Sequence, residues 1–458
     1  MKDINRVMMM HQPSLFIDLY ELTMAACYHD QHMFHPATFS LFIREYPPNR
    51  SYFVSEGLEE VVAFLDSFRF RSEDVDYLDS TNLFSREFLE YLSTIRFTGD
   101  VFAIPEGRLF FKNEPVMEIT APIIEAQLVE TFVLNAINFQ VITATKASRC
   151  LSAAGGRNLI DFSLRRTQGT DAGIKAARAS YIGGFDGTSN VLAGKQYGIP
   201  TRGTMAHSFI TSFKEEIDAF YAFAESFPDQ TVLLIDTYDT MEGAKKAVKV
   251  SRDMRKRGKA LKGVRLDSGD MLVLSKEVRS LLDQAGENEV QIFASGAMDE
   301  YKIEAYSKNS APIDAFGIGT KMGVSADAPY TDSAYKLVEY HGRPVLKLST
   351  GKKTLVGRKQ VFRKRVDGTM VKDTIALRQE HLEGEPLLVQ VMKKGARQSS
   401  PEPLSVIRDR FLDEFSTLED RYKKLIHPES YPVELGLELQ QLQKQVIHDV
   451  RERELGES

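Results

Sequence analysis

The 458-residue sequence has little cysteine and no long hydrophobic run. Its two cysteines, Cys27 and Cys150, are too few for a disulfide framework or a four-cysteine zinc site. No apolar run approaches the roughly 20 residues that are needed to span a bilayer, and the first residues lack the apolar core of a secretory signal. We therefore expect a cytoplasmic protein in a reducing compartment, without a membrane-spanning segment.

The sequence also lacks an excess of positive charge. Lys and Arg number 58 against 64 Asp and Glu, which gives a net charge of −6. A protein that binds nucleic acid usually carries a basic face, so this balance argues against a nucleic-acid partner. It leaves room for a local basic pocket that binds a phosphorylated metabolite. The length predicts two or three domains, and the share of hydrophobic residues, 43%, is ordinary for a globular protein.

Seven short apolar runs are present between residues 157 and 320, and each ends in glycine or in polar side chains. They are Arg157–Ser163, Ser180–Asp186, Gly198–Thr204, Thr231–Asp236, Gly263–Asp267, Gln291–Gly296 and Asp314–Thr320. Most of the intervals are close to the length of one strand–helix unit, about 30 residues. Repeated units of this kind predict a parallel sheet with covered faces. If the sheet closes into a barrel, the ends of all seven runs meet on one rim, where such barrels carry their chemistry.

The rest of the chain differs in character. Helical and strand-like spacing alternates before residue 150, strand-like segments return after residue 330, and amphipathic helical spacing follows residue 403. The predicted fold class is α/β: an irregular parallel barrel, a discontinuous α+β domain and a helical C-terminal region. The predicted ranges are 1–150, completed by 330–400, for the α+β domain, 151–329 for the barrel and 401–458 for the helical region.

Two late runs end in glycine-rich turns that suit a phosphate. Ser295-Gly296 follows one run, and Gly317-Ile-Gly319-Thr320 closes the last. Glycines after a strand let backbone N–H groups approach an anion, and late barrel strands often supply a phosphate site. Either turn alone could be an ordinary strand-to-helix connection, but the two together favour phosphate binding.

Three further run ends carry reactive side chains. Arg265, Asp267 and Asp270 surround a Ser-Gly pair, where a carboxylate suits ribose hydroxyls or hydrated Mg²⁺. The spacing also fits a helix N-cap at Asp267 or Ser268, and Asp236 has the same two interpretations, with the structural one favoured. His207 lies just past a run end, and its ordinary pKa of about 6.5 suits acid–base or nucleophilic work.

Two other pairs point to function only weakly. Phe162 and Arg165 could stack on a flat ring and grip a carboxylate, although a core Phe and a surface Arg explain them as well. Asp18 and Tyr20, in a predicted helix over 14–30, carry no internal mark of function.

These segments, in this order, resemble the nicotinate phosphoribosyltransferase family. The resemblance extends from residue 14 to about 360, leaves the C-terminal helical region without a usable match, and rests on Asp18–Met24, Phe42–Arg44 with Gly57-Leu58, Asp161–Gly169, Gly203–Ser208, Val264–Asp270, Phe293–Gly296 and Phe316–Thr320. It implies a type II phosphoribosyltransferase fold and a head-to-tail homodimer with shared active sites. The implied reaction joins nicotinate to 5-phosphoribosyl-1-pyrophosphate (PRPP), which gives nicotinate mononucleotide and pyrophosphate. It also implies ATP as a co-substrate, Mg²⁺ carried with PRPP and ATP, no resident protein-bound metal, and a place in NAD salvage biosynthesis.

The resemblance also assigns roles to residues of this chain. His207 matches the histidine that ATP phosphorylates, Asp267 would hold the ribose hydroxyls, and Arg265 would face the pyrophosphate. The pyridine ring would stack on Phe162, its carboxylate would lie near Arg165, and Tyr20 and Asp18 would come from the other subunit. The 5′-phosphate would be bound by Ser295, Gly296, Gly319 and Thr320.

One position bears on the choice of base. Related nicotinamide enzymes place an acidic residue where this chain reads Gly187-Thr-Ser189-Asn190, and a carboxylate there would repel nicotinate. Ser189 therefore favours the acid over the amide. The alternatives are a nicotinamide or quinolinate phosphoribosyltransferase and a non-catalytic barrel that binds phosphorylated metabolites. A weaker alternative is an aldolase-type barrel with a Schiff-base lysine. None of the seven runs contains a lysine, although Lys321 follows the last of them.

Overall fold

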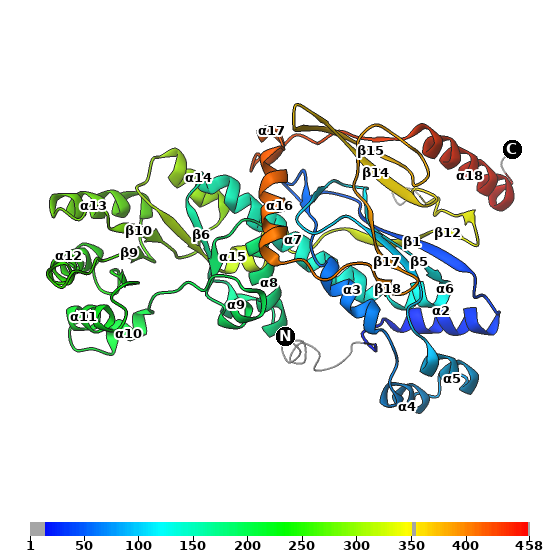
Figure 1. Ribbon diagram of the computed structural model, residues 1–458, viewed down its shortest axis with the longest axis horizontal. Coiled ribbons are helices and arrows are strands. Elements are labelled where there is room, and N and C mark those ends of the chain that lie inside the picture. The colour runs from blue at the N-terminus through cyan, green and yellow to red at the C-terminus, as the bar shows by residue number, and fades with distance from the viewer. Residues whose placement is uncertain (1–13, 350–353, 457–458) are drawn as a thin grey trace. The chain divides into compact units, whose positions relative to one another are not determined.

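The computed structural model describes residues 14–349 and 354–456 (Figure 1). The chain forms two compact units: unit 1 comprises Met1–Ile142 and Tyr330–Ser458, and unit 2 comprises Thr143–Pro329. The division after Ile142 and the boundary predicted after residue 150 both fall inside helix α7 (Glu130–Ala154).

Unit 2 is built on a parallel six-stranded sheet with the order β7-β6-β11-β10-β9-β8. Its strands are β6 (Asn158–Asp161), β7 (Gly187–Thr188), β8 (Val232–Leu234), β9 (Gly263–Leu266), β10 (Gln291–Ala294) and β11 (Ala315–Ile318). These strands are short and almost wholly buried, as parallel strands with two covered faces are. The fold class is confirmed, and the predicted barrel is irregular, because β7 and β8 are the two edges of the sheet in the described residues.

Helices follow the strands of unit 2 in the order that the run spacing predicts. After β6 come a 3₁₀ turn, η1 (Leu164–Arg166), and α8 (Thr170–Ile182), and after β7 come α9 (Val191–Tyr197), α10 (His207–Thr211) and α11 (Glu216–Ser226). The later helices are α12 (Thr240–Lys256), α13 (Met271–Gln284), α14 (Glu300–Lys308) and α15 (Thr320–Gly323). Each of the strands β8 to β11 is therefore followed directly by one helix.

Two of the seven predicted runs are not the strands that the sequence suggested. Ser180–Asp186 begins inside helix α8, because its apolar residues continue the buried face of that helix up to Gly183, and the strand comes only at Gly187–Thr188. Gly198–Thr204 forms a single bridge between Thr201 and Thr188. Pro200 has no N–H to donate to a ladder, which keeps this segment at the margin of the sheet.

Unit 1 contains an antiparallel seven-stranded sheet with the order β13-β12-β1-β5-β3-β17-β18. The strands are β1 (Pro36–Ile43), β3 (Asp100–Ala103), β5 (Pro115–Pro122), β12 (Ser333–Tyr340), β13 (Arg343–Pro344), β17 (Val389–Lys393) and β18 (Ala396–Arg397). Strand β1 lies antiparallel between β5 and β12, with Leu41 opposite both Met117 and Tyr335. Segments from before and after unit 2 therefore share one sheet, as a discontinuous α+β domain requires.

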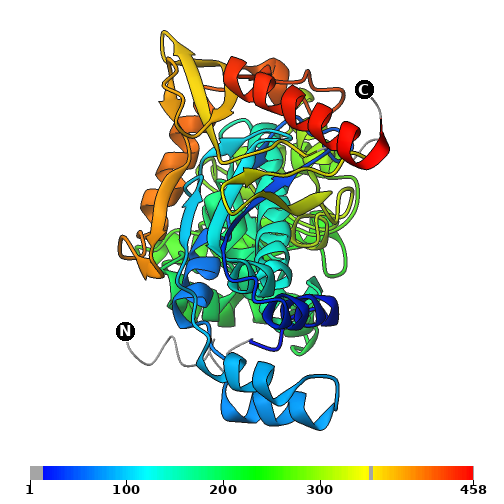
Figure 2. The ribbon, with the colours of Figure 1, turned by 90° about the vertical axis from the view of Figure 1, so that its right-hand side faces the viewer.

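Two smaller sheets and a set of helices complete unit 1. The four-stranded sheet has the order β16-β14-β15-β19, from β14 (Lys359–Val366), β15 (Thr369–Leu377), β16 (Glu385–Pro386) and β19 (Val433–Leu435), and β2 (Phe53–Val54) pairs with β4 (Leu109–Phe110). The helices are α2 (Leu19–Asp30), α3 (Leu58–Ser67), α4 (Ser72–Ser80), α5 (Arg86–Thr94), α6 (Ile123–Leu128), α16 (Leu404–Ser416), α17 (Asp420–Lys423) and α18 (Leu437–Leu455). The region 401–458 is mostly helical, but its strand β19 joins the four-stranded sheet, and α18 lies alongside β15 (Figure 2).

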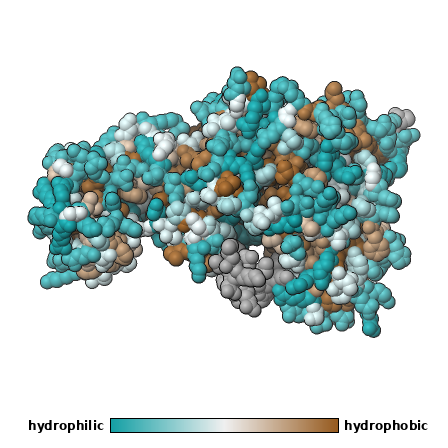
Figure 3. Space-filling view, in the orientation of Figure 1, coloured by the Kyte–Doolittle hydropathy of each residue, from teal (hydrophilic) through white to brown (hydrophobic). Residues whose placement is uncertain are grey.

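The visible surface is mainly hydrophilic over both units, with hydrophobic residues in small scattered groups (Figure 3). Scattered apolar residues are normal on the surface of a globular protein. Among the described residues, no helix combines the length and the apolar character that crossing a membrane would take.

Candidate active site

The polar ends of the apolar runs in unit 2 lie side by side at the carboxyl ends of the strands, because the carboxyl ends of parallel strands point the same way. There Asp161 ends β6, Asp236 and Asp267 follow β8 and β9, and Ser295 follows β10. The backbone joins these ends directly: the Ser295 N–H donates to the Leu266 carbonyl at 2.8 Å. The sheet thus brings together residues more than 100 positions apart.

Phe162 lies against the last strand at close range. Its N–H donates to the Ile318 carbonyl at 2.8 Å. A Cβ on Gly317 would lie 2.5 Å from a carbon of the Phe162 ring, so only glycine leaves room for the ring at this place. The ring is partly exposed, as a stacking platform for a ligand must be. Arg165 lies three residues on, in the exposed turn η1.

Asp161 holds the neighbouring segments of the site together through hydrogen bonds. Its carboxylate accepts the Ser163 N–H at 2.8 Å and the Thr188 hydroxyl at 2.7 Å, and its carbonyl accepts the Ser189 N–H at 2.9 Å. Burial raises the pKa of the Asp161 carboxyl. The structure therefore places Ser189 beside the end of β6, the strand that Phe162 directly follows. The sequence pattern assigned no role to Asp161, since one acidic residue at a strand end has no local signal.

Arg265 is a largely buried cation with an unused donor. One of its terminal nitrogens donates to the Thr204 hydroxyl, and its Nε is buried without a hydrogen-bond partner in the described residues. Burial lowers the pKa of the Arg265 guanidinium, while the negative charges of Asp267 and Asp236 oppose this shift. The positive charge of Arg165 lowers the same pKa, so the two arginines lie within electrostatic reach of each other. A site with two cations close together favours an anionic ligand.

His207, Asp267 and Ser295 form one connected cluster. Nε2 of His207 lies 3.7 Å from Oδ2 of Asp267, and Oδ1 of Asp267 accepts the Ser295 hydroxyl at 2.5 Å. On its other side, Nδ1 of His207 lies 3.2 Å from the Thr237 hydroxyl. The side chains of His207 and Asp267 keep 42% and 35% of their surface exposed, so a ligand can reach both.

The structure rejects the helix-cap interpretation of Asp267. The N-cap of α13 is Asp270, whose carboxylate accepts the Leu272 and Val273 N–H groups. Asp236 is likewise no cap, because α12 is capped by Asp239. The carboxylate of Asp236 instead accepts the Asp267 N–H at 3.1 Å and the Ser268 hydroxyl at 2.5 Å. Asp236, which local sequence favoured as structural, thus ties the ends of β8 and β9 together and belongs in the site.

The glycine turns after β10 and β11 are shaped by their backbone. Gly296 has φ +88°, and a Cβ there would lie 1.9 Å from the Asp267 carbonyl oxygen. Gly319 is the N-cap of α15, so Thr320 opens that helix with an exposed side chain. The N–H groups of Met322 and Gly323 donate to the Gly319 carbonyl, so the N–H groups of Thr320 and Lys321, at the start of the helix, are the ones that could bind a ligand. Nearby Lys321 is paired with Asp299, which disfavours it as a Schiff-base lysine.

Gly296→Ala should therefore lower the free energy of unfolding by about 2 kcal/mol or more, since the new methyl group meets backbone at a positive φ. Gly203→Ala is the matched control, because a Cβ at Gly203 would meet nothing within 4 Å. Urea denaturation of both variants measures the difference. Equal stability of the two variants would contradict this account of the turn.

Asp18 and Tyr20 belong to unit 1 and are described there by themselves. Asp18 is the residue before α2, and its carboxylate accepts the Thr131 hydroxyl at 3.1 Å. Tyr20 is half-exposed, and burial, followed by the charges of Glu130 and Glu21, raises the pKa of its hydroxyl. Both side chains therefore lie at the surface of unit 1, close to the buried carboxyl groups of Glu21 and Glu130.

The fold and these strand-end residues define a class of protein, the α/β proteins that bind small ligands at the carboxyl ends of a parallel sheet. Comparison with known sequences identifies the family. Models of the N-terminal domain, the family region and the C-terminal domain of nicotinate phosphoribosyltransferase match residues 15–138, 157–379 and 378–443. The chain belongs to the nicotinate phosphoribosyltransferase family. The third match covers a region where the sequence alone offered no usable resemblance.

Individual relatives agree with this assignment. A nicotinate phosphoribosyltransferase of Mycobacterium tuberculosis is 49% identical over 425 residues, which covers 92% of this chain and 91% of that protein. One of Bacillus subtilis is 36% identical over 477 residues, with 96% of each chain covered. The crystal structure of human nicotinic acid phosphoribosyltransferase matches with a TM-score of 0.84 and 29% identity, covering 94% of this chain and 99% of that one.

Proposed function

We propose that this protein joins nicotinate to PRPP, coupled to ATP hydrolysis, in the salvage route to NAD. The bond from the pyridine nitrogen to C1′ of the ribose forms, the bond from C1′ to the pyrophosphate oxygen breaks, and pyrophosphate leaves with the electron pair. The observation that carries this proposal is the cluster of His207, Asp267 and Ser295 at the sheet edge, in a chain that matches the family over nearly its whole length.

The pyridine nitrogen is already a nucleophile, so the reaction needs positioning more than a strong base. The ring of nicotinate would stack on Phe162, with its carboxylate towards Arg165. Ser189 carries no charge, so it would leave a carboxylate ligand unopposed. This arrangement supports nicotinate as the base.

The sugar and its phosphates would lie across the neighbouring strand ends. Asp267 would accept the ribose hydroxyls and, as an anion, would stabilise the positive charge that develops at C1′ when pyrophosphate departs. Among the residues that the structure describes, the buried Nε–H of Arg265 has no hydrogen-bond partner, so it could donate to the pyrophosphate. Ser295, Gly296, Gly319 and Thr320 would hold the 5′-phosphate through hydroxyl and backbone N–H groups.

ATP would phosphorylate His207: a bond forms between a ring nitrogen and the γ-phosphorus, and ADP leaves. Mg²⁺ would neutralise phosphate charge on PRPP and ATP. In the part of the chain that the structure describes, no group of three or more His, Cys, Asp or Glu side chains could hold a metal ion. As the resemblance to the family implies, we assign Mg²⁺ to the substrates, with the partly exposed carboxylate of Asp267 as a contact from the protein.

A single assay tests the function. Purified protein is given nicotinate, PRPP and Mg-ATP, with one component omitted in each arm, and pyrophosphate release is measured. We expect release that requires nicotinate and PRPP and that ATP stimulates. No release in the complete mixture would favour a non-catalytic protein that binds phosphorylated metabolites.

Ser189→Asp should reduce kcat/KM for nicotinate by about 10-fold or more, because the new carboxylate repels that of the substrate. The kcat/KM for nicotinamide should fall less or rise. Ser189→Asn is the matched control, since asparagine has nearly the same size as aspartate but no charge. A parallel fall for both bases in Ser189→Asp would remove this position from base selection.

We also propose a homodimer in which Asp18 and Tyr20 of one subunit complete the site of the other. As pure proteins assayed with ATP, Tyr20→Ala should be nearly inactive and His207→Ala should keep only the slow rate that does not depend on ATP. Mixed and allowed to re-form dimers, they should recover about a quarter of the wild-type activity, since half of the dimers are mixed and each carries one intact site. Recovery that is absent after verified subunit exchange would place both residues in the same site of one chain.

A further inference from the structure

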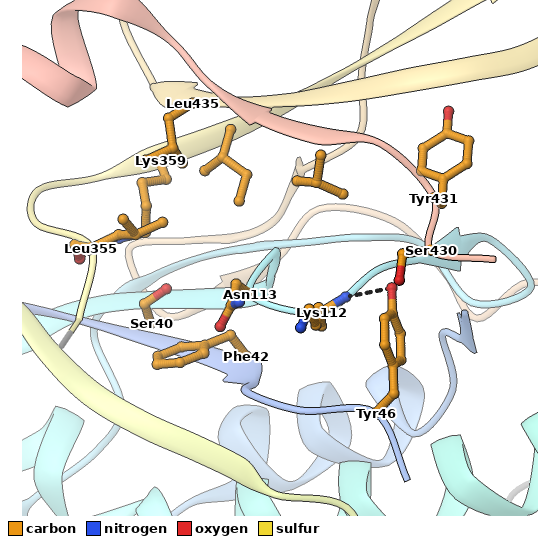
Figure 4. A pocket seen from close by; sticks show the side chains of 12 residues that line it. Ser40, Phe42, Tyr46, Lys112, Asn113, Leu355, Lys359, Ser430, Tyr431 and Leu435 are labelled. Carbon is orange, nitrogen blue, oxygen red and sulfur yellow. Dashed lines mark hydrogen bonds between the residues drawn. The ribbon is translucent and has the colours of Figure 1, made fainter. Parts of the chain in front are cut away.

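Unit 1 contains a cavity of about 400 Å³ between its seven-stranded and four-stranded sheets (Figure 4). Ser40 and Phe42 on β1 line it from one sheet, and Ile375 on β15 lines it from the other. The volume lies in the range of pockets that bind small molecules. All of its lining residues belong to unit 1, and none has a place in the proposed reaction.

The walls of the cavity are mainly apolar. The apolar side chains come from both sheets and from the segment before β14: Phe42, Leu355, Ile375, Val433 and Leu435. On β1, Ser40 and Phe42 share a face because side chains alternate along a strand. An aliphatic or aromatic body of a ligand would therefore lie against side chains that water solvates poorly.

Ser40 provides a polar group without a partner. The residue is fully buried, and its hydroxyl makes no hydrogen bond in the described residues. In Figure 4 this hydroxyl points away from β1, towards the side where Lys359 lies. A buried hydroxyl that lacks a partner costs free energy, so a ligand that bonds to it would gain affinity.

The charges around the cavity favour an anion. Its lining includes two lysines, Lys112 and Lys359, and no acidic side chain, but Lys112 is already paired with Glu45 at 3.2 Å. The buried Lys359 pairs with Glu118 at 3.0 Å, and Glu118 also pairs with Arg378, so one carboxylate stands between two cations. The ammonium of Lys359 also donates to the Gly357 carbonyl at 2.7 Å. Lys359 therefore contributes a positive electrostatic potential to the cavity. The hydrogen-bond donor for a ligand is the Ser40 hydroxyl.

We propose that this cavity binds a small apolar carboxylic acid. One carboxylate oxygen accepts a hydrogen bond from the Ser40 hydroxyl in the positive field of Lys359, and the apolar body fills the space between the two sheets. A neutral apolar molecule would fit the walls but would leave the excess positive charge unused.

Calorimetric titration of the full chain with octanoate tests the proposal, with 1-octanol as the neutral counterpart. Octanoate should bind more tightly than 1-octanol. Ser40→Ala should weaken octanoate binding by about 10-fold or more, as the loss of a hydrogen bond to a charged group does, and should leave 1-octanol binding unchanged. Because Ser40→Ala removes only an unpartnered hydroxyl, we expect the variant to fold normally.

Val433→Phe should fill the cavity and abolish binding of both probes. Val366→Phe, at an exposed end of β14, is the matched control and should bind like the wild type. Three results would each overturn the proposal. They are unchanged octanoate binding in Ser40→Ala, binding of either probe to a folded Val433→Phe protein, and tighter binding of 1-octanol than of octanoate. Titration in the presence of saturating nicotinate separates this cavity from the base site, and binding is measured whether or not the protein transfers phosphoribosyl groups.

Discussion

His207→Ala should lose all labelling by γ-labelled ATP, and its rate of pyrophosphate release with ATP should fall to the rate without ATP. The wild-type label should be acid-labile and alkali-stable, as a phosphorus–nitrogen bond is. The substitution removes the imidazole that lies beside Asp267 and Thr237. Slow transfer without ATP should remain, because attack by the pyridine nitrogen does not require the phosphohistidine.

Ser208→Ala is the control for this variant. Ser208 is the exposed neighbour of His207 in α10, and its substitution should leave both labelling and ATP stimulation unchanged. Quantitative label in His207→Ala, or equal stimulation by ATP in the variant and the wild type, would remove His207 from the proposed role.

Asp267→Asn should lower kcat/KM for PRPP by about 100- to 1000-fold, as the loss of one preorganised electrostatic contact at a reacting centre does. Asparagine keeps the size of the side chain and can still accept the Ser295 hydroxyl. It lacks the negative charge that would stabilise the positive charge at C1′. The loss should therefore appear in kcat more than in the KM for PRPP, which steady-state kinetics at saturating nicotinate would measure.

Asp270→Asn is the matched control, three residues along the same turn. Asp270 caps helix α13, and asparagine is about as good an N-cap as aspartate, so stability and kcat/KM should both stay close to the wild type. If the two variants lost activity equally, the effect would come from the turn as a whole and not from the charge of Asp267.

The strands of unit 2 could be predicted because buried parallel strands appear as continuous apolar runs. The runs that contain β6, β8, β9, β10 and β11 were identified from the sequence, and so was the polar end of each. Ser180–Asp186 was not, because the apolar residues of a buried helix end look the same as those of a strand over so few positions. Length and flanking residues distinguish a helix end from a strand only when the apolar run is longer than these few residues.

The site residues show the same limit more sharply. Asp267 and Asp270 lie in one turn, and each could cap a helix or face a ligand, so their order in the sequence does not separate them. The pairing of β9 with β10 separates them, because it brings Ser295 against Asp267 and leaves Asp270 to cap α13. Asp236 became part of the site for the same reason, through its bonds to the end of β9.

The sequence by itself determined the fold class and the family, and it predicted most members of the candidate site, because apolar periodicity and short motifs are local properties. Only the tertiary structure decided which carboxylate faces His207, that Arg265 has an unused donor, and that a cavity lies between the two sheets of unit 1. Each of these depends on contacts between segments far apart in the chain, and Ser40 and Ile375, which line the cavity from strands hundreds of residues apart, show why no local pattern could reveal it.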